Sequence, residues 1–119
     1  MKPRPRVLDG KTVKVRVGCG ALFITVNYDE DNKIREVFAY LGKSGSCFSS
    51  QINSLCRMIS IALRNDVPIE DIVDHLKGQR CSVSSIDEGT EYLSCADAIA
   101  KIIEMIYKGN KDENSTNTV

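Results

Sequence analysis

Cysteine is the residue type in this 119-residue sequence that offers the widest choice of chemistry. The chain holds five of them: Cys19, Cys47, Cys56, Cys81 and Cys95. A thiolate can ligate a metal or act as a nucleophile, whereas a buried neutral thiol packs as a small apolar group. No two of these cysteines have the CxxC spacing that is common in redox pairs and zinc knuckles. Each cysteine must therefore be judged from the element that holds it.

Cys95 lies in the stretch SCADAIAKII, which has the pattern of a helix start. Ser94 and Asp97 have the spacing of a capping box ahead of an apolar helical run. This spacing places Cys95 in the first helical turn, where unpaired backbone N–H groups and the helix dipole favour a thiolate. We therefore expect the thiol of Cys95 to take part in chemistry.

The other cysteines divide into one core residue and three at the ends of elements. Cys56 belongs to an apolar stripe with helical spacing, which predicts burial. The stripe consists of Ile52, Leu55, Cys56, Ile59 and Leu63. Cys19 precedes a strand, Cys47 precedes a helix and Cys81 lies in a loop. With Cys95 they could supply the four sulfur ligands of a closed zinc site, and four scattered thiols are the alternative reading.

The pattern around these cysteines predicts a sheet followed by helices. Alternating apolar and β-branched residues predict strands at 12–17, 21–28 and 34–41, the last two joined by the polar hairpin DEDNK. A shorter strand ending at Asp9 and Gly10 would be a fourth. Three helices follow. They begin near Cys47, near Pro68 and near Ser94. We expect an α+β domain with a small antiparallel sheet of three to four strands and three helices.

Composition bounds the domain and its surroundings. We expect an N-terminal arm at 1–10 with its basic residues in solvent, one domain at 11–108, and a disordered polar tail at 109–119. Sixteen basic residues balance sixteen acidic ones, which argues against nucleic-acid binding. No apolar run reaches the length of a membrane span, and the N-terminus lacks the apolar core of a signal peptide. We expect a cytoplasmic protein that binds no membrane.

Several stretches together resemble one known family. They are CGALFITVN, EVFAYLGKSGSC, ISIALRNDVP, LKGQRC and SCADAIAKII. In their order and cysteine positions they resemble the TSCPD domain, found near the C-terminus of B12-dependent ribonucleotide reductases and as small free-standing proteins. The resemblance runs from about Gly18 to Tyr107. The motif that names the family is similar to LSCAD here, with Leu93 for the threonine and Ala96 for the proline.

The resemblance implies a set of four cysteines. In this sequence the set falls on Cys19, Cys47, Cys81 and Cys95, and it leaves out Cys56. A zinc ion is the cofactor that four such ligands suit. The resemblance brings no catalytic role for the domain alone, and no cysteine follows Cys95 to supply the reductase's C-terminal redox pair. We therefore expect no enzymatic activity.

A second motif, LGKSGSCFSS, could bind an anion. Lys43, Ser44, Gly45 and Ser46 lead into a helix start, where free N–H groups, the dipole and a cation converge. The stretch lacks the spacing of a P-loop, and a loop that only leads into the helix is the alternative. By analogy with nucleotide-reducing enzymes, a nucleotide or a nucleotide-derived signal is the ligand to expect.

Two functional classes follow from these motifs. In the first, the protein is a non-enzymatic zinc module, related to ribonucleotide reductase, that binds a protein partner or forms a homo-oligomer. In the second, it sequesters a nucleotide-like ligand through the loop. A thiol-redox enzyme is weaker, because the CxxC pair is missing. The single histidine, His75, is expected to interact with the dipole at a helix end.

Overall fold

A computed structural model describes residues 3–42, 47–82 and 84–117, without the side chains of 47, 48 and 112–117. In chain order the elements are β1 (Asp9–Val17), β2 (Gly20–Tyr28), β3 (Ile34–Leu41), α1 (Cys47–Arg64), α2 (Ile69–Leu76), β4 (Ser85–Asp87), β5 (Thr90–Tyr92) and α3 (Cys95–Asn117). The predicted α+β class is confirmed. Among the described residues, no helix combines the length and the apolar character needed to cross a membrane.

β1, β2 and β3 form an antiparallel meander in that order. Val17 pairs with Gly20 across the first turn, and Leu22 pairs with Leu41 on the next strand. Gly20 has φ of 133°, a value that a residue with a side chain rarely adopts. Because side chains alternate along each strand, this register sends the buried aliphatic residues of all three strands to one face.

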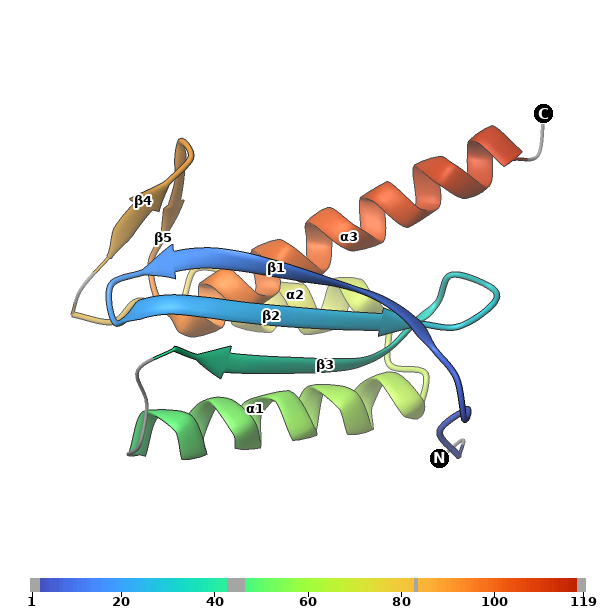
Figure 1. Cartoon of the computed structure of the whole chain (residues 1–119), viewed down its shortest axis with the longest axis horizontal. Coiled ribbons are helices and arrows are strands. Elements are labelled where there is room, and N and C mark those ends of the chain that lie inside the picture. The colour runs from blue at the N-terminus through green and yellow to red at the C-terminus, as the bar shows by residue number, and fades with distance from the viewer. Residues whose placement is uncertain (1–2, 43–46, 83, 118–119) are drawn as a thin grey trace.

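That apolar face is covered by helices. Leu22, Ile24 and Val26 of β2 are fully buried, as are Ile99 and Ile103 of α3. α2 and α3 lie behind the sheet in Figure 1, and their apolar residues join the same core. The opposite face of the sheet, toward the viewer, has no helix over it.

α1 lies along the outer edge of β3 (Figure 1). The hydroxyl of Ser60 accepts a hydrogen bond from the backbone N–H of Val37 at 3.0 Å and donates to its carbonyl at 3.2 Å. An edge strand with unpaired backbone groups would be open to pairing with another chain. α1 therefore closes this edge of the sheet.

The N-terminal arm is attached to the sheet through Arg4. Its guanidinium donates two hydrogen bonds to the carboxylate of Glu36, at 2.9 and 3.0 Å. Asn27 and Arg64 also donate to Glu36, which is 0% exposed. Arg4 keeps 43% of its side chain exposed, as expected of a solvated arm, and it also pairs with Glu36, because a buried carboxylate requires partners.

Three features of the fold differ from the sequence predictions. β1 begins at Asp9, so Asp9 and Gly10 continue the first long strand rather than end a separate short one. β4 and β5 form an antiparallel hairpin that the sequence did not predict. α3 continues to Asn117, past the predicted domain end at residue 108. The disorder of 109–119 stays a prediction.

Candidate metal centre

Asp97 ties the start of α3 to the segment that follows α2. Its buried carboxylate accepts hydrogen bonds from the backbone N–H groups of Gly78 at 2.8 Å and Leu93 at 3.0 Å, and it pairs with Lys101 at 2.8 Å. Burial acts to raise the pKa of Asp97, but these hydrogen bonds and the lysine charge hold that pKa below its ordinary value. The carboxylate is thus ionised, and its hydrogen bonds hold the start of α3 to the segment after α2.

The same junction positions Cys81. The N–H of Asp97 donates to the hydroxyl of Ser94 at 3.0 Å, which confirms the predicted helix cap. That hydroxyl donates in turn to the carbonyl of Gln79 at 2.7 Å. The backbone N–H of Cys81 donates to the carbonyl of Leu93 at 3.0 Å. Residues 78–81 therefore run beside residues 93–97, and Cys81 lies near Cys95.

Cys19 approaches the same place from the turn between β1 and β2. The β4–β5 hairpin holds the end of β1 close to α3. Ser85 donates its hydroxyl to the carbonyl of Arg16 at 3.0 Å, and the N–H of Arg16 donates to the carboxylate of Asp87 at 2.8 Å. The hairpin thus joins the sheet to the chain segment that begins α3.

The thiols of Cys19, Cys81 and Cys95 interact with one another. Cys19 and Cys81 are exposed and Cys95 is half-buried. Burial is the largest cause that raises the pKa of Cys95, and together with the neighbouring thiols of Cys19 and Cys81 it brings that pKa to about 11. Three of the four predicted ligands are therefore neighbours. They are up to 76 residues apart in the sequence (95 minus 19).

This pKa corrects one expectation. The position of Cys95 at a helix start predicted a stabilised thiolate, and in the metal-free chain that prediction is wrong. The loss of hydration and two neighbouring thiols outweigh the dipole of α3. A divalent cation among the sulfurs would reverse this balance, because a coordinating thiol is deprotonated outright.

The donor set is that of a zinc site, although its sulfurs do not enclose an ion as they stand. Among the residues that the structure describes, no three cysteine, histidine or acidic side chains are arranged closely enough to hold a metal. The three thiols would have to turn toward one centre to reach Zn–S distances of about 2.3 Å. Two of them are exposed, which leaves them room to turn. The donors therefore fit zinc by chemistry and proximity.

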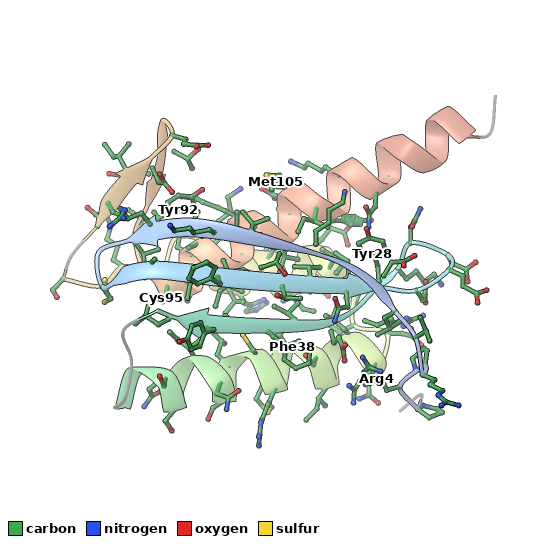
Figure 2. All side chains as sticks on the ribbon, in the orientation of Figure 1. Arg4, Tyr28, Phe38, Tyr92, Cys95 and Met105 are labelled. Carbon is green, nitrogen blue, oxygen red and sulfur yellow. The ribbon has the colours of Figure 1, made fainter. Side chains whose placement is uncertain are left out.

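The fourth predicted ligand, Cys47, is the first residue of α1, and its side chain lies outside the described residues. In Figure 1 the start of α1, the β1–β2 turn and the start of α3 are at the same end of the molecule. Figure 2 shows Cys95 at that end. The backbone thus brings Cys47 to the correct side of the domain.

Two other residues behave as the sequence predicted. Cys56 is 2% exposed within the core, and burial raises its pKa to about 11, which keeps the thiol neutral. His75 lies in the last turn of α2, where its Nδ1 is 2.7 Å from the carbonyl oxygen of Asp71 in the same helix. The predicted burial of Cys56 in the core is confirmed.

The predicted anion loop, Lys43, Ser44, Gly45 and Ser46, lies outside the described residues. Beside it, between the end of β3 and the first turns of α1, is a cavity of about 200 Å³. Its lining includes Tyr40, Ser49 and Asn53. These polar and aromatic groups belong to the two elements that flank the loop in the chain.

Comparison with known proteins decides the family. A model of the TSCPD domain matches residues 1–107. The chain belongs to the TSCPD domain family. This TSCPD domain is similar to the vitamin B12-dependent ribonucleotide reductases of Agrobacterium fabrum, with 24% identity over 91% of this chain, and of Bradyrhizobium diazoefficiens, with 26% identity over 83%. It spans only 9% and 8% of those two proteins. No solved structure matches it significantly.

Two features that position this site of the TSCPD domain were not predicted from the sequence. They are the β4–β5 hairpin and the hydrogen bond between Gly78 and Asp97. The β4–β5 hairpin turns at Glu88 and Gly89, with φ of 48° and 83°. A Gly after a polar residue between two short β-prone segments is a hairpin signal that could have been found. The hydrogen bond from the N–H of Gly78 to Asp97 had no local signal, because it joins the turn after α2 to α3, 19 residues further along the chain.

Proposed function

We propose that this TSCPD domain is a non-enzymatic zinc-binding module. Cys19, Cys47, Cys81 and Cys95 would hold one zinc ion, which would link the sheet, the loop after α2 and the starts of two helices. The observation that supports this most is the proximity of the Cys19, Cys81 and Cys95 thiols. Structural zinc sites of this type contribute folding free energy directly.

Two observations favour a structural over a catalytic role. The single histidine, His75, has its Nδ1 2.7 Å from the carbonyl oxygen of Asp71 in its own helix, and among the described residues it has no hydrogen bond with a cysteine. None of the described cysteines, Cys19, Cys56, Cys81 and Cys95, is in a disulfide, which suits a reducing cytoplasm. We place the module there as an accessory or partner-binding protein related to ribonucleotide reductase.

The test is the metal content and stability of matched cysteine variants. Protein purified without added zinc should carry about one zinc per chain by elemental analysis, and a strong chelator should cause cooperative loss of structure. Cys95→Ser should lose both zinc and most of the stability. Cys56→Ala is the control, which should retain zinc and cost about 1–3 kcal/mol of packing energy.

Two results would contradict the proposal. One is a metal-free protein that melts identically with and without chelator. The other is equal zinc content in the wild type and Cys95→Ser. Loss of zinc from Cys56→Ala would instead show that the division of the cysteines into four ligands and one core residue is incorrect.

We also propose a second function, the binding of a nucleotide or a nucleotide-derived signal at the loop of Lys43, Ser44, Gly45 and Ser46. The cavity of about 200 Å³ beside this loop favours it. A nucleotide that binds the folded state should raise the melting temperature by mass action. Lys43→Ala should reduce that rise while the unliganded melting temperature stays nearly unchanged. Absence of any shift with millimolar nucleotides would contradict this function.

A further inference from the structure

The face of the sheet that no helix covers carries exposed aromatic rings. The register of the three strands places Phe23, Phe38 and Tyr40 on this face, away from the core residues. Phe38 is 50% exposed and Tyr40 is 61% exposed, whereas Phe23 is half-buried. Phe38 lies toward α1 in Figure 2. Such large exposed rings on a small domain are a binding feature rather than part of the core.

Phe23 and Tyr40 form a single aromatic row. They are opposite each other on β2 and β3, with ring centroids 6.2 Å apart and ring planes inclined by 37°. The Nζ of Lys14, on β1, lies 5.9 Å from the centroid of Phe23. The row Lys14–Phe23–Tyr40 thus sets a cation beside two rings, an arrangement suited to a flat aromatic group with negative charge attached.

The next row of paired residues, toward the turn between β1 and β2, has small side chains and one positive charge. Arg16 lies opposite Ala21, and the N–H of Gly42 donates to the carbonyl of Ala21 at 2.9 Å. Ala21 has a small side chain and Gly42 has none, so the Phe23 ring reaches to 3.7 Å from where a Cβ of Gly42 would lie, and the exposed Arg16 borders this row. This row is two residues from the aromatic one, about 7 Å along the strands. An anion there would be a short distance from a ring stacked on Phe23 and Tyr40.

The remaining charges on this face also favour an anionic ligand. Among the strand residues that point to it, Glu36 alone is acidic, and Arg4 and Arg64 neutralise it. Arg57 is exposed and lies on the same side of α1 as Arg64, about two turns away. Two copies of this face would bring like charges together, which opposes self-association through it.

We infer that this face is a nucleobase-stacking subsite for a free nucleotide, with the base on Phe23 and Tyr40 and the phosphate over Ala21 and Gly42 beside Arg16. The inference rests on the second proposed function and deepens it, because it locates the base. A free nucleotide fits better than a nucleic-acid strand. A strand needs a groove that follows several phosphates, whereas here the Arg4–Glu36–Asn27 network occupies the far end of the face.

The test compares AMP with ribose 5-phosphate, which carries the same phosphate and sugar without a base. Tyr40→Ala should weaken AMP binding about tenfold or more in calorimetric titrations and leave ribose 5-phosphate binding unchanged. Tyr40→Phe should retain AMP affinity, because the ring is kept. Arg16→Ala should weaken both ligands by the same factor. Met105→Ala, at a 53% exposed residue on α3 (Figure 2), is the control and should change neither.

The outcomes separate the inference from the function on which it rests. If neither AMP nor ribose 5-phosphate binds the wild type, the nucleotide-binding function itself fails. If both bind and Tyr40→Ala weakens neither, the function stands and the stacking subsite is overturned. Tighter binding of a short single-stranded oligonucleotide than of AMP would overturn the free nucleotide as occupant. A dimer that Tyr40→Ala abolishes would likewise assign the face to a second copy of the chain.

Discussion

Replacement of Glu36 by glutamine tests whether the buried carboxylate holds the N-terminal arm and α1 to the sheet. Its carboxylate accepts four hydrogen bonds, two from Arg4 at 2.9 and 3.0 Å, one from Asn27 at 2.8 Å and one from Arg64 at 3.2 Å. Glu36→Gln removes the negative charge and turns one acceptor into a donor. That donor would face N–H groups of the arginines or the asparagine.

The expected loss of stability depends on how exposed the partners of Glu36 are. Breaking a fully buried ion pair costs about 3–5 kcal/mol, because a charge is left without compensation. Here the side chains of Arg4 and Arg64 are 43% and 24% exposed, so water can partly replace the lost carboxylate. We therefore expect Glu36→Gln to lower the free energy of unfolding by about 2–3 kcal/mol.

The effect should depend on pH in a defined direction. Burial alone would raise the pKa of Glu36, but the hydrogen bonds from Arg4 and Asn27 and the charge of Arg4 outweigh burial and hold the pKa below 4.5. A carboxyl with a lowered folded-state pKa stabilises the protein above its unfolded-state pKa, and this contribution is lost as the pH falls through the folded-state value. The difference between wild type and Glu36→Gln should therefore be constant near neutrality and shrink below about pH 4.5.

Urea unfolding followed by circular dichroism, with the protein as purified and without chelator, measures this difference. Asp66→Asn is the matched control. Asp66 pairs with Arg35 at 3.0 Å, but its side chain is 56% exposed, so its loss should cost less than about 1 kcal/mol. Equal costs for the two variants, or a Glu36→Gln cost that does not shrink in acid, would refute this account of the arm.

Three further predictions concern the core and the sheet. Ser60→Ala should cost about 1–3 kcal/mol in the same assay, because it leaves buried β3 backbone groups without partners, whereas the exposed Ser54→Ala should cost less than about 0.5 kcal/mol. Gly10→Ala should cost about 1–3 kcal/mol, because the new Cβ would collide with the side-chain oxygen of Asn27; an unchanged unfolding midpoint would contradict this. Cys56, with a pKa of about 11, should resist a thiol reagent at neutral pH until the protein unfolds, and labelling in the native state would show that it is not in the core.

The sequence by itself determined the three long strands, the three helices and their apolar faces, but not the β4–β5 hairpin. Alternation along the first three strands and the helical stripe of Ile52, Cys56 and Ile59 depend only on the periods of strand and helix, which are local properties. The same locality identified Cys56 as a core residue and Ser94 as a helix cap. The family resemblance selected the other four cysteines, because their order along the chain is itself visible in the sequence.

Tertiary structure alone decided which of these residues meet and how they ionise. Cys95 has the local position of a stabilised thiolate, yet burial and the thiols of Cys19 and Cys81 raise its pKa to about 11. Balanced total charge concealed the fact that Lys14 and Arg16 lie on one open face beside aromatic rings. Proximity and desolvation arise from the packing of segments distant in sequence, and no local period or spacing encodes either of them.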